Sequence, residues 1–189
     1  MTMKKLIIVT APSGSGKTTI VRHILSKFDE LSFSISATTR DKRPHEKDGR
    51  DYYFFTVEKF KELVDTNAFV EWEEVYPNQY YGTLRAEIER LWKEGKQIVF
   101  DVDVKGAVSI KKAFPKESLA LFIKVPSIEV LKERLQKRKT ETAASLQKRL
   151  KRATAEMKYE NKFDTVLVND VLESALKEAE KIVTAYLSV

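Results

Sequence analysis

The sequence has no cysteine, only two histidines and no long apolar run. Without cysteine it cannot form disulfide bonds, cysteine-ligated zinc sites or a thiol nucleophile. The apolar residues 6–9 follow two lysines, as in a signal peptide, but the run ends at Pro12 and is too short. No other run approaches the length of a membrane span. We therefore expect a cytoplasmic protein without a membrane-embedded part, and interpret His23 and His45 as surface or hydrogen-bonded residues rather than ligands.

Glycine and proline are also scarce, with six and five residues, and no low-complexity linker divides the 189 residues. An apolar content of 42% is enough for one core, so we expect a single domain with small inserted parts. The net charge is +6, but residues 132–152 hold nine basic and two acidic side chains, which leaves the remainder at −1. Because this basic cluster has few aromatic residues and no groove-reading motif, it indicates phosphate handling rather than nucleic-acid binding.

Two of the glycines lie in the stretch APSGSGKTT (residues 11–19), directly after the apolar residues 6–9. A strand, a glycine-containing turn, Lys17 and a helix over 18–28 predict a phosphate-binding loop whose backbone N–H groups surround an anion. Ala11 replaces the first glycine of the usual pattern, which requires a negative φ there. The alternative is an ordinary Gly/Ser turn. The expected ATP-binding residues of the loop are Ser13, Gly14, Ser15, Gly16, Lys17, Thr18 and Thr19.

The rest of the chain alternates apolar runs with amphipathic segments, which predicts an α/β fold with a parallel sheet flanked by helices. We expect strands near 5–10, 33–37, 97–103, 119–125 and 165–169. We expect helices at 84–94, 106–114, 128–139, 144–159 and 171–187. Residues 36–84 interrupt this alternation with a strand at 52–55, a helix at 57–66 and a strand at 69–76. They predict an inserted mixed α/β lobe in a core formed by residues 1–35, 85–128 and 156–189.

Two carboxylates follow the apolar residues 97–100, at Asp101 and Asp103. The carboxyl end of a neighbouring parallel strand faces the same crevice as the phosphate loop. Asp101 is therefore a candidate, with the Thr18 hydroxyl, for holding Mg²⁺ directly or through water. The alternative is that an aspartate after a buried strand only caps the next helix.

Four blocks identify a family resemblance: residues 36–44 (SATTRDKRP), 49–54 (GRDYYF), 69–72 (FVEW) and 80–83 (YYGT). In this order and spacing they resemble guanylate kinases, ATP:GMP phosphotransferases with a P-loop NTPase-type core, and the resemblance covers residues 7–170. It implies that the GMP phosphate is held by Arg40, Arg43, Tyr52 and Tyr81. It also implies that guanine is surrounded by Ser36, Glu71, Thr83 and Asp103.

These residue types suit the implied roles. Arg40 and Arg43 are three residues apart and can fork onto one phosphate dianion. Guanine offers two donors, N1–H and the 2-amino group, so a buried acceptor such as Glu71 favours it over adenine. Taken singly, one of Tyr52 and Tyr53 should be a core residue, and Glu71 could be a surface strand residue.

The basic segment, residues 129–155, matches the family's helical lid, and the resemblance implies that Arg134, Arg138 and Arg149 close on the ATP phosphates together with Lys17. Asn169 lies in the segment that matches the family's adenine contact. Lys132, Lys137 and Lys151 are interpreted as a solvated face. Lys105 stands where the family commonly has glutamine.

The expected function is transfer of the γ-phosphoryl group of Mg-ATP to GMP, with dGMP as a further acceptor, in purine nucleotide metabolism. The expected cofactor is Mg²⁺, and the expected partners are the substrates ATP and GMP, with no nucleic acid or membrane. One alternative is a kinase for another phosphorylated small molecule. A second is a scaffold module of the same fold that binds phosphopeptides without catalysis, but such modules usually have a degraded phosphate loop.

Overall fold

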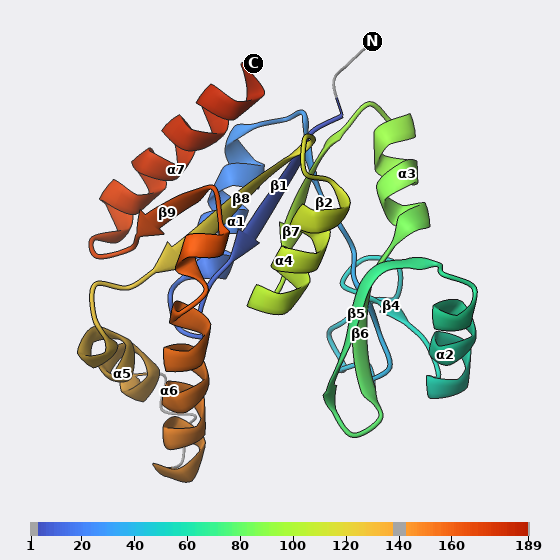
Figure 1. Cartoon of the computed structure of the whole chain (residues 1–189), viewed down its shortest axis with the longest axis horizontal. Coiled ribbons are helices and arrows are strands. Elements are labelled where there is room, and N and C mark those ends of the chain that lie inside the picture. The colour runs from blue at the N-terminus through green and yellow to red at the C-terminus, as the bar shows by residue number, and fades with distance from the viewer. Residues whose placement is uncertain (1–3, 138–142, 189) are drawn as a thin grey trace.

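A computed structural model describes residues 4–137 and 143–188 (Figure 1). Five parallel strands form the core sheet in the order β2-β7-β1-β8-β9. Their bounds are β1 Leu6–Thr10, β2 Leu31–Phe33, β7 Gln97–Asp101, β8 Ser118–Lys124 and β9 Thr165–Val168. All five residues of β1 are buried, as expected for the central strand of a parallel sheet covered on both faces.

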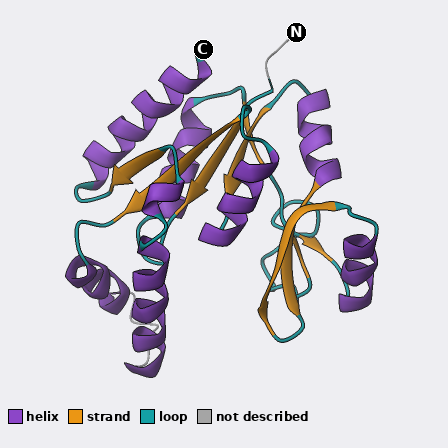
Figure 2. Cartoon of the chain, in the orientation of Figure 1, coloured by secondary structure: helices purple, strands orange, loops and turns teal. Residues whose placement is uncertain are grey.

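Helices cover both faces of this sheet (Figure 2). Helices α1 (Lys17–Lys27) and α7 (Leu172–Leu187) pack on the face that carries Ile7 and Val9 of β1. Helices α3 (Arg85–Lys93) and α4 (Val104–Ala113) pack on the face that carries Leu6 and Ile8. The alternation of the strand side chains thus divides one apolar run between two hydrophobic clusters.

A second sheet, β4-β3-β6-β5, forms the inserted lobe with helix α2 (Val57–Asp65). Its strands are β3 Ala37–Thr38, β4 Tyr53–Phe54, β5 Phe69–Tyr76 and β6 Gln79–Leu84. The lobe has its own apolar cluster, in which the Phe60 ring stacks on Phe69 and Tyr80 with centroids 4.4 and 5.4 Å away. Strand β6 was not among the expected elements.

The expected single strand at 33–37 is wrong, because the chain changes sheets there. Ser34 N still donates to Val99 O of the core sheet at 2.9 Å, whereas Ser36 O accepts from Tyr53 N of the lobe at 2.9 Å. The segment is therefore β2, a crossing and β3. Its apolar alternation continues across the crossing, which explains why the pattern resembled one strand.

Helices α5 (Ile128–Lys137) and α6 (Ala143–Met157) lie beyond the carboxyl end of β8 and form a helix pair (Figure 1). Leu131, Leu135 and Ala153 are fully buried in the cluster that joins them. A 3-10 turn, η1 (Glu160–Lys162), leads from α6 into β9. Among the helices of the described residues, none is long and apolar enough to cross a membrane.

Candidate active site

The loop between β1 and α1 depends on two glycines. Gly14 and Gly16 have φ values of 95° and 89°, in the left-handed region that favours glycine. A Cβ at Gly14 would lie 2.9 Å from Leu135 Cδ2, and a Cβ at Gly16 would overlap the amide of Asn169. Among the described non-glycine residues only Asn67 and Asn78 have positive φ. Ala11 therefore has the negative φ that alanine needs at the first position of the loop.

Lys17 begins α1 and reaches the end of the neighbouring strand. Its Nζ lies 2.7 Å from Asp101 Oδ1 and donates to Val102 O, also at 2.7 Å. Asp101 is brought there because β1 and β7 pair in parallel with Val9 opposite Asp101. The structure thus brings the phosphate loop and the acidic end of β7 together, as the sequence predicted.

A cavity of about 920 Å³ opens above the phosphate loop. One wall is the loop itself, and the other comes from α6 and the end of β5. The lining residues used below are Lys17, Thr18, Tyr76, Asp103, Arg149 and Arg152. Of the other expected loop residues, Ser13, Gly14, Gly16 and Thr19 also line it, whereas Ser15 is fully buried beneath it.

Asn169 supports the phosphate loop from below. Its side chain is 2% exposed, and Nδ2 donates to Ser15 O at 2.7 Å. The structure therefore places the Asn169 side chain against the loop backbone rather than in the cavity. Sequence reasoning placed Asn169 at the nucleotide but missed this contact.

A smaller cavity of about 280 Å³ lies between the lobe and the core. Five expected GMP-binding residues line it: Ser36, Tyr52, Glu71, Tyr81 and Asp103. Val75, Tyr76, Asp103 and Arg152 line both this cavity and the larger one, so the two cavities adjoin.

Glu71 is the most perturbed carboxyl group of this cavity. Burial raises the pKa of Glu71 to about 7; a hydrogen bond from Thr83 opposes the rise, and the charges of Asp103 and Glu73 add to it. Thr83 Oγ1 donates to Glu71 Oε1 at 2.6 Å, so Thr83 is a partner of this carboxyl. A Cβ at Gly106 would approach Glu71 Oε2 to 3.1 Å, so a larger residue at that helix position would crowd the Glu71 carboxylate.

Asp103 is the N-cap of α4, because its Oδ1 accepts from Gly106 N at 2.9 Å. The sequence raised a capping role as the alternative for Asp101, but the residue that caps the helix is Asp103. The second oxygen, Oδ2, faces Arg152 at 3.3 Å. Asp103 both caps a helix and borders the cavity, so the two interpretations do not exclude each other.

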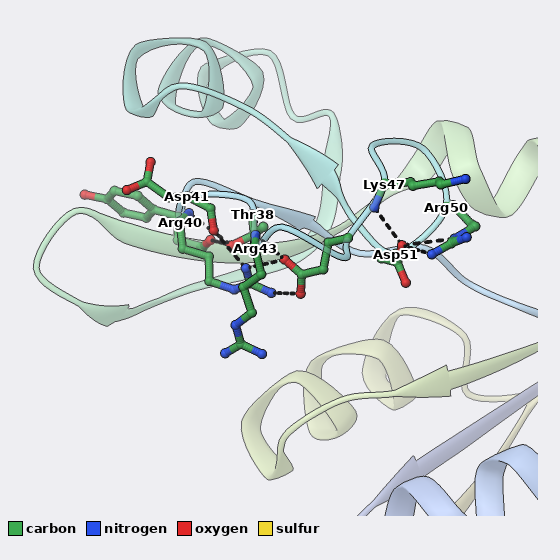
Figure 3. Close-up of polar contacts among 9 residues, drawn as sticks. Thr38, Arg40, Asp41, Arg43, Lys47, Arg50 and Asp51 are labelled. Carbon is green, nitrogen blue, oxygen red and sulfur yellow. Dashed lines mark hydrogen bonds and ion pairs between the residues drawn. The ribbon is translucent and has the colours of Figure 1, made fainter.

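Part of the Arg40 guanidinium is already used in an ion pair with Glu46 (Figure 3). Its NH1 and NH2 groups donate to the two carboxylate oxygens of Glu46 at 2.7 and 2.6 Å, and its guanidinium lies 4.9 Å from the centroid of the Tyr52 ring. The Arg40 hydrogen bond and the backbone N–H of Arg43 lower the pKa of Glu46 to about 2 against the cost of burial. NH1 also donates to Asp41 O at 2.9 Å, so most of the NH1 and NH2 end of Arg40 is occupied and only its remaining donors can bind a phosphate.

Arg43 contributes its backbone N–H to Glu46 at 2.9 Å, while its exposed guanidinium extends away from the ion pair (Figure 3). The two arginines therefore do not form one symmetric fork. Sequence reasoning missed Glu46. The available signal was a carboxylate three residues after Arg43 in the same loop.

Comparison with known proteins decides the family. Residues 3–186 match the family model described as guanylate kinase. The chain belongs to the guanylate kinase family. A guanylate kinase of Porphyromonas gingivalis is 46% identical over 187 residues, which cover 98% of this chain and 100% of that protein. A guanylate kinase of Salinibacter ruber is 44% identical over 185 residues, 98% of each chain.

Among solved structures, the crystal structure of guanylate kinase from Anaplasma phagocytophilum superposes with a TM-score of 0.77 at 27% identity. The match covers 98% of this chain and 87% of that one. The predicted α/β fold class, with its parallel core sheet, is therefore confirmed.

The three arginines that the guanylate kinase resemblance assigned to ATP have different positions. Arg149 lines the larger cavity from α6. Arg134 instead donates from α5 to Asp170 O at 2.9 Å, beside β9. Arg138 lies outside the described residues. Of the two arginines that the structure describes, Arg149 therefore borders the larger cavity and Arg134 does not line it.

Lys105, the departure from the family's common glutamine, forms an ion pair with Glu73. This contact joins the start of α4 to strand β5 of the lobe. A glutamine could donate a hydrogen bond there but could not balance the charge of Glu73. The substitution therefore adds an electrostatic connection between core and lobe.

Proposed function

We propose that this protein transfers the γ-phosphoryl group of ATP to GMP, giving ADP and GDP. The observation that carries the proposal is the junction of the two cavities, one above a phosphate loop and one lined by the carboxylates Glu71 and Asp103. Donor and acceptor nucleotides bound in them would direct their phosphates toward the same place, beside Lys17. The names of the relatives support the same activity.

Recognition of guanine rests on its two donors. Ionised Glu71 accepts from N1–H of guanine, while Thr83 donates to the same carboxylate and Asp103 lines the same cavity. Adenine presents an acceptor at N1 and would leave the buried carboxylate unpaired. The GMP phosphate would lie toward Tyr52 and Tyr81, within reach of the free donors of Arg40 and of Arg43. Ser36 lines the same cavity and completes the proposed set.

Catalysis needs positioning and positive charge more than a general base, because the attacking phosphate oxygen of GMP is already anionic. Lys17 and Arg149 supply that charge from the two walls of the larger cavity. We assign Arg134 and Arg138 to the same role in a closed arrangement of the helix pair α5–α6. Closure would also exclude water and limit hydrolysis of ATP.

Mg²⁺ supplies further charge neutralisation when bound with ATP. The Thr18 hydroxyl and the Asp101 carboxylate are oxygen donors of the kind that Mg²⁺ prefers. The described residues contain no group of three or more acidic, histidine or cysteine side chains that could hold a metal. This fits an ion held chiefly by phosphates and water, with one or two protein ligands.

We further propose that dGMP serves as an acceptor and that the protein acts in the cytoplasm on free nucleotides, without a nucleic-acid or membrane partner. The expected division into a core (1–35, 85–128, 156–189), a GMP-binding lobe (36–84) and a lid (129–155) is part of the same proposal.

The experiment is a coupled assay of ADP formation with Mg-ATP and each nucleoside monophosphate in turn. We expect rapid turnover with GMP and little with AMP, CMP or UMP. Preference for another monophosphate would overturn the guanine assignment. Binding of GMP without turnover would instead support a binding module of the same fold.

A further inference from the structure

Arg152 lies where the cavities of this protein meet. A third cavity of about 390 Å³ lies beside the other two, between β5, α4 and α6. Three residues line all three cavities: Val75, Asp103 and Arg152. Two of these, Asp103 and Arg152, face each other as an ion pair. Nothing in the sequence patterns or in the proposed function assigns a role to Arg152.

The contacts of Arg152 connect two elements. Its Nε donates to Glu156 Oε1 at 2.7 Å, one turn along α6, and its NH2 group lies 3.3 Å from Asp103 Oδ2 on the other side. The opposite oxygen of Asp103 is held by Gly106 N. The Asp103 carboxylate is thus oriented by one donor from its own helix and one from α6.

The charges around the smaller cavity point to the same pair. Among the described residues, its lining holds four carboxylates, Glu71, Glu73, Asp101 and Asp103, and one basic side chain, Arg152. Asp101 is paired with Lys17, and Glu73 with Lys105. Of the two remaining carboxylates, which the proposed function assigns to guanine, Asp103 is paired with Arg152, whereas Glu71 accepts a hydrogen bond from Thr83.

We propose that Arg152 is a positioning residue for base selection: it holds Asp103 toward the base site and balances the charge of Asp103, so that Asp103 can accept from the guanine 2-amino group while Glu71 accepts from N1–H. The inference rests on the proposed GMP site. Because Arg152 lies on α6, as Arg149 does, base recognition becomes coupled to the position of the helix that borders the ATP cavity.

The experiment compares Arg152→Ala and Arg152→Lys with Lys151→Ala, which removes the adjacent, exposed cation that lines none of the cavities. kcat and KM are measured for GMP, for inosine monophosphate and for ATP. Inosine monophosphate keeps N1–H but lacks the 2-amino group, so it presents one donor instead of two. Wild-type turnover with GMP, measured first, tests the proposed function independently of Arg152.

We expect Arg152→Ala to raise KM for GMP about tenfold, the loss of one charge-assisted contact, and to raise KM for inosine monophosphate much less. KM for ATP and kcat should change less than about twofold, Arg152→Lys should restore most of the GMP affinity, and Lys151→Ala should behave as the wild type.

Provided that the wild-type enzyme phosphorylates GMP, three outcomes with the variants would overturn the inference about Arg152. A lower KM for GMP would mean that Arg152 competes with guanine for Asp103. A fall in kcat with a higher KM for ATP would make Arg152 an ATP-phosphate contact. If both Arg152 variants fold, as an unchanged Tm would show, and neither has a changed KM for GMP, the Arg152–Asp103 pair is only a surface contact. If Arg152→Ala does not fold, Arg152→Gln takes its place as the variant without the positive charge, and Arg152→Lys remains the conservative comparison.

Discussion

The pKa of Glu71 leads to a quantitative prediction for GMP binding. The group has a pKa of about 7 in the folded chain against an ordinary value of 4.5, mainly because it is buried. At neutral pH the free protein is thus a mixture of carboxylic acid and carboxylate. In the proposed site the Glu71 carboxylate accepts from guanine N1–H, and protonation of the carboxylate would replace one of its acceptor oxygens by a donor. Binding of GMP should therefore release a proton from Glu71.

The size of the effect follows from the titration. With a pKa of about 7, the ionised fraction of Glu71 is about one-eleventh at pH 6, half at pH 7 and ten-elevenths at pH 8. The Kd for GMP should therefore fall about tenfold between pH 6 and pH 8, which corresponds to about 1.4 kcal/mol. Calorimetric titration with GMP in the absence of ATP measures this directly.

The GMP phosphate itself ionises near pH 6, so the matched control is Glu71→Gln. This variant keeps the size of the side chain and removes its titration, while the contribution of the phosphate stays. We expect weaker binding of GMP and a flatter dependence on pH. Equal pH slopes for the two proteins would refute the assignment of Glu71 as the titrating reader of the base.

The raised pKa of Glu71 also determines how the stability of the wild type differs from that of Glu71→Gln as pH changes. Because the folded pKa lies above the ordinary value, the wild type loses stability as pH rises from about 4.5 to 7, relative to a side chain that does not titrate. Glu71→Gln should thus have the higher Tm at pH 8 and lose this advantage toward pH 5. Such a profile also shows that the weaker GMP binding of the variant is not a folding defect.

Three further substitutions test the rest of the site. Lys17→Ala should lower kcat by about 10²-fold or more while Tm and GMP binding stay close to wild type, because the charge beside the transferring group is lost; normal turnover would contradict the role. Glu46→Gln should raise KM for GMP several-fold without affecting KM for ATP, since Arg40 loses its bidentate partner. The control is Asp51→Asn, which disturbs the exposed ion pair with Arg50 in the same loop (Figure 3) and should have little effect on either KM. Gly16→Ala should destabilise the protein by about 1 to 3 kcal/mol and raise KM for ATP, because it combines strained backbone with a clash against Asn169; an unchanged Tm in thermal unfolding would contradict this.

The parts of the fold that could be predicted were those with local signals. Strand β1, the phosphate loop and α1 follow from a buried apolar run, Gly14, Gly16 and an amphipathic segment. Strand β5 was predicted with its observed bounds, Phe69–Tyr76. The approach of Lys17 to Asp101 followed from topology alone, since parallel neighbours end at one edge of a sheet.

The parts that could not be predicted depend on contacts distant in sequence. The division of residues 33–37 between two sheets is decided by Val99 and Tyr53, which supply the competing hydrogen bonds. The buried contact of Asn169 with Ser15 spans 154 positions, and no local pattern distinguishes it from a ligand contact. The position of Arg134 beside Asp170 likewise depends on how α5 packs against the end of the sheet.

The ion pairs of the site explain how an acidic lining can belong to a nucleotide pocket. Each balancing cation comes from a different element: Lys17 from α1, Lys105 from α4 and Arg152 from α6. These pairs balance the charges of Asp101, Glu73 and Asp103 in the lining of the proposed base site. In the proposed mechanism, a bound phosphate that attracted Lys17 would leave Asp101 without its partner and available as an oxygen ligand. The pairing thus links the acidic end of β7 to the occupancy of the phosphate loop, and Lys17→Ala would remove that link together with the catalytic charge.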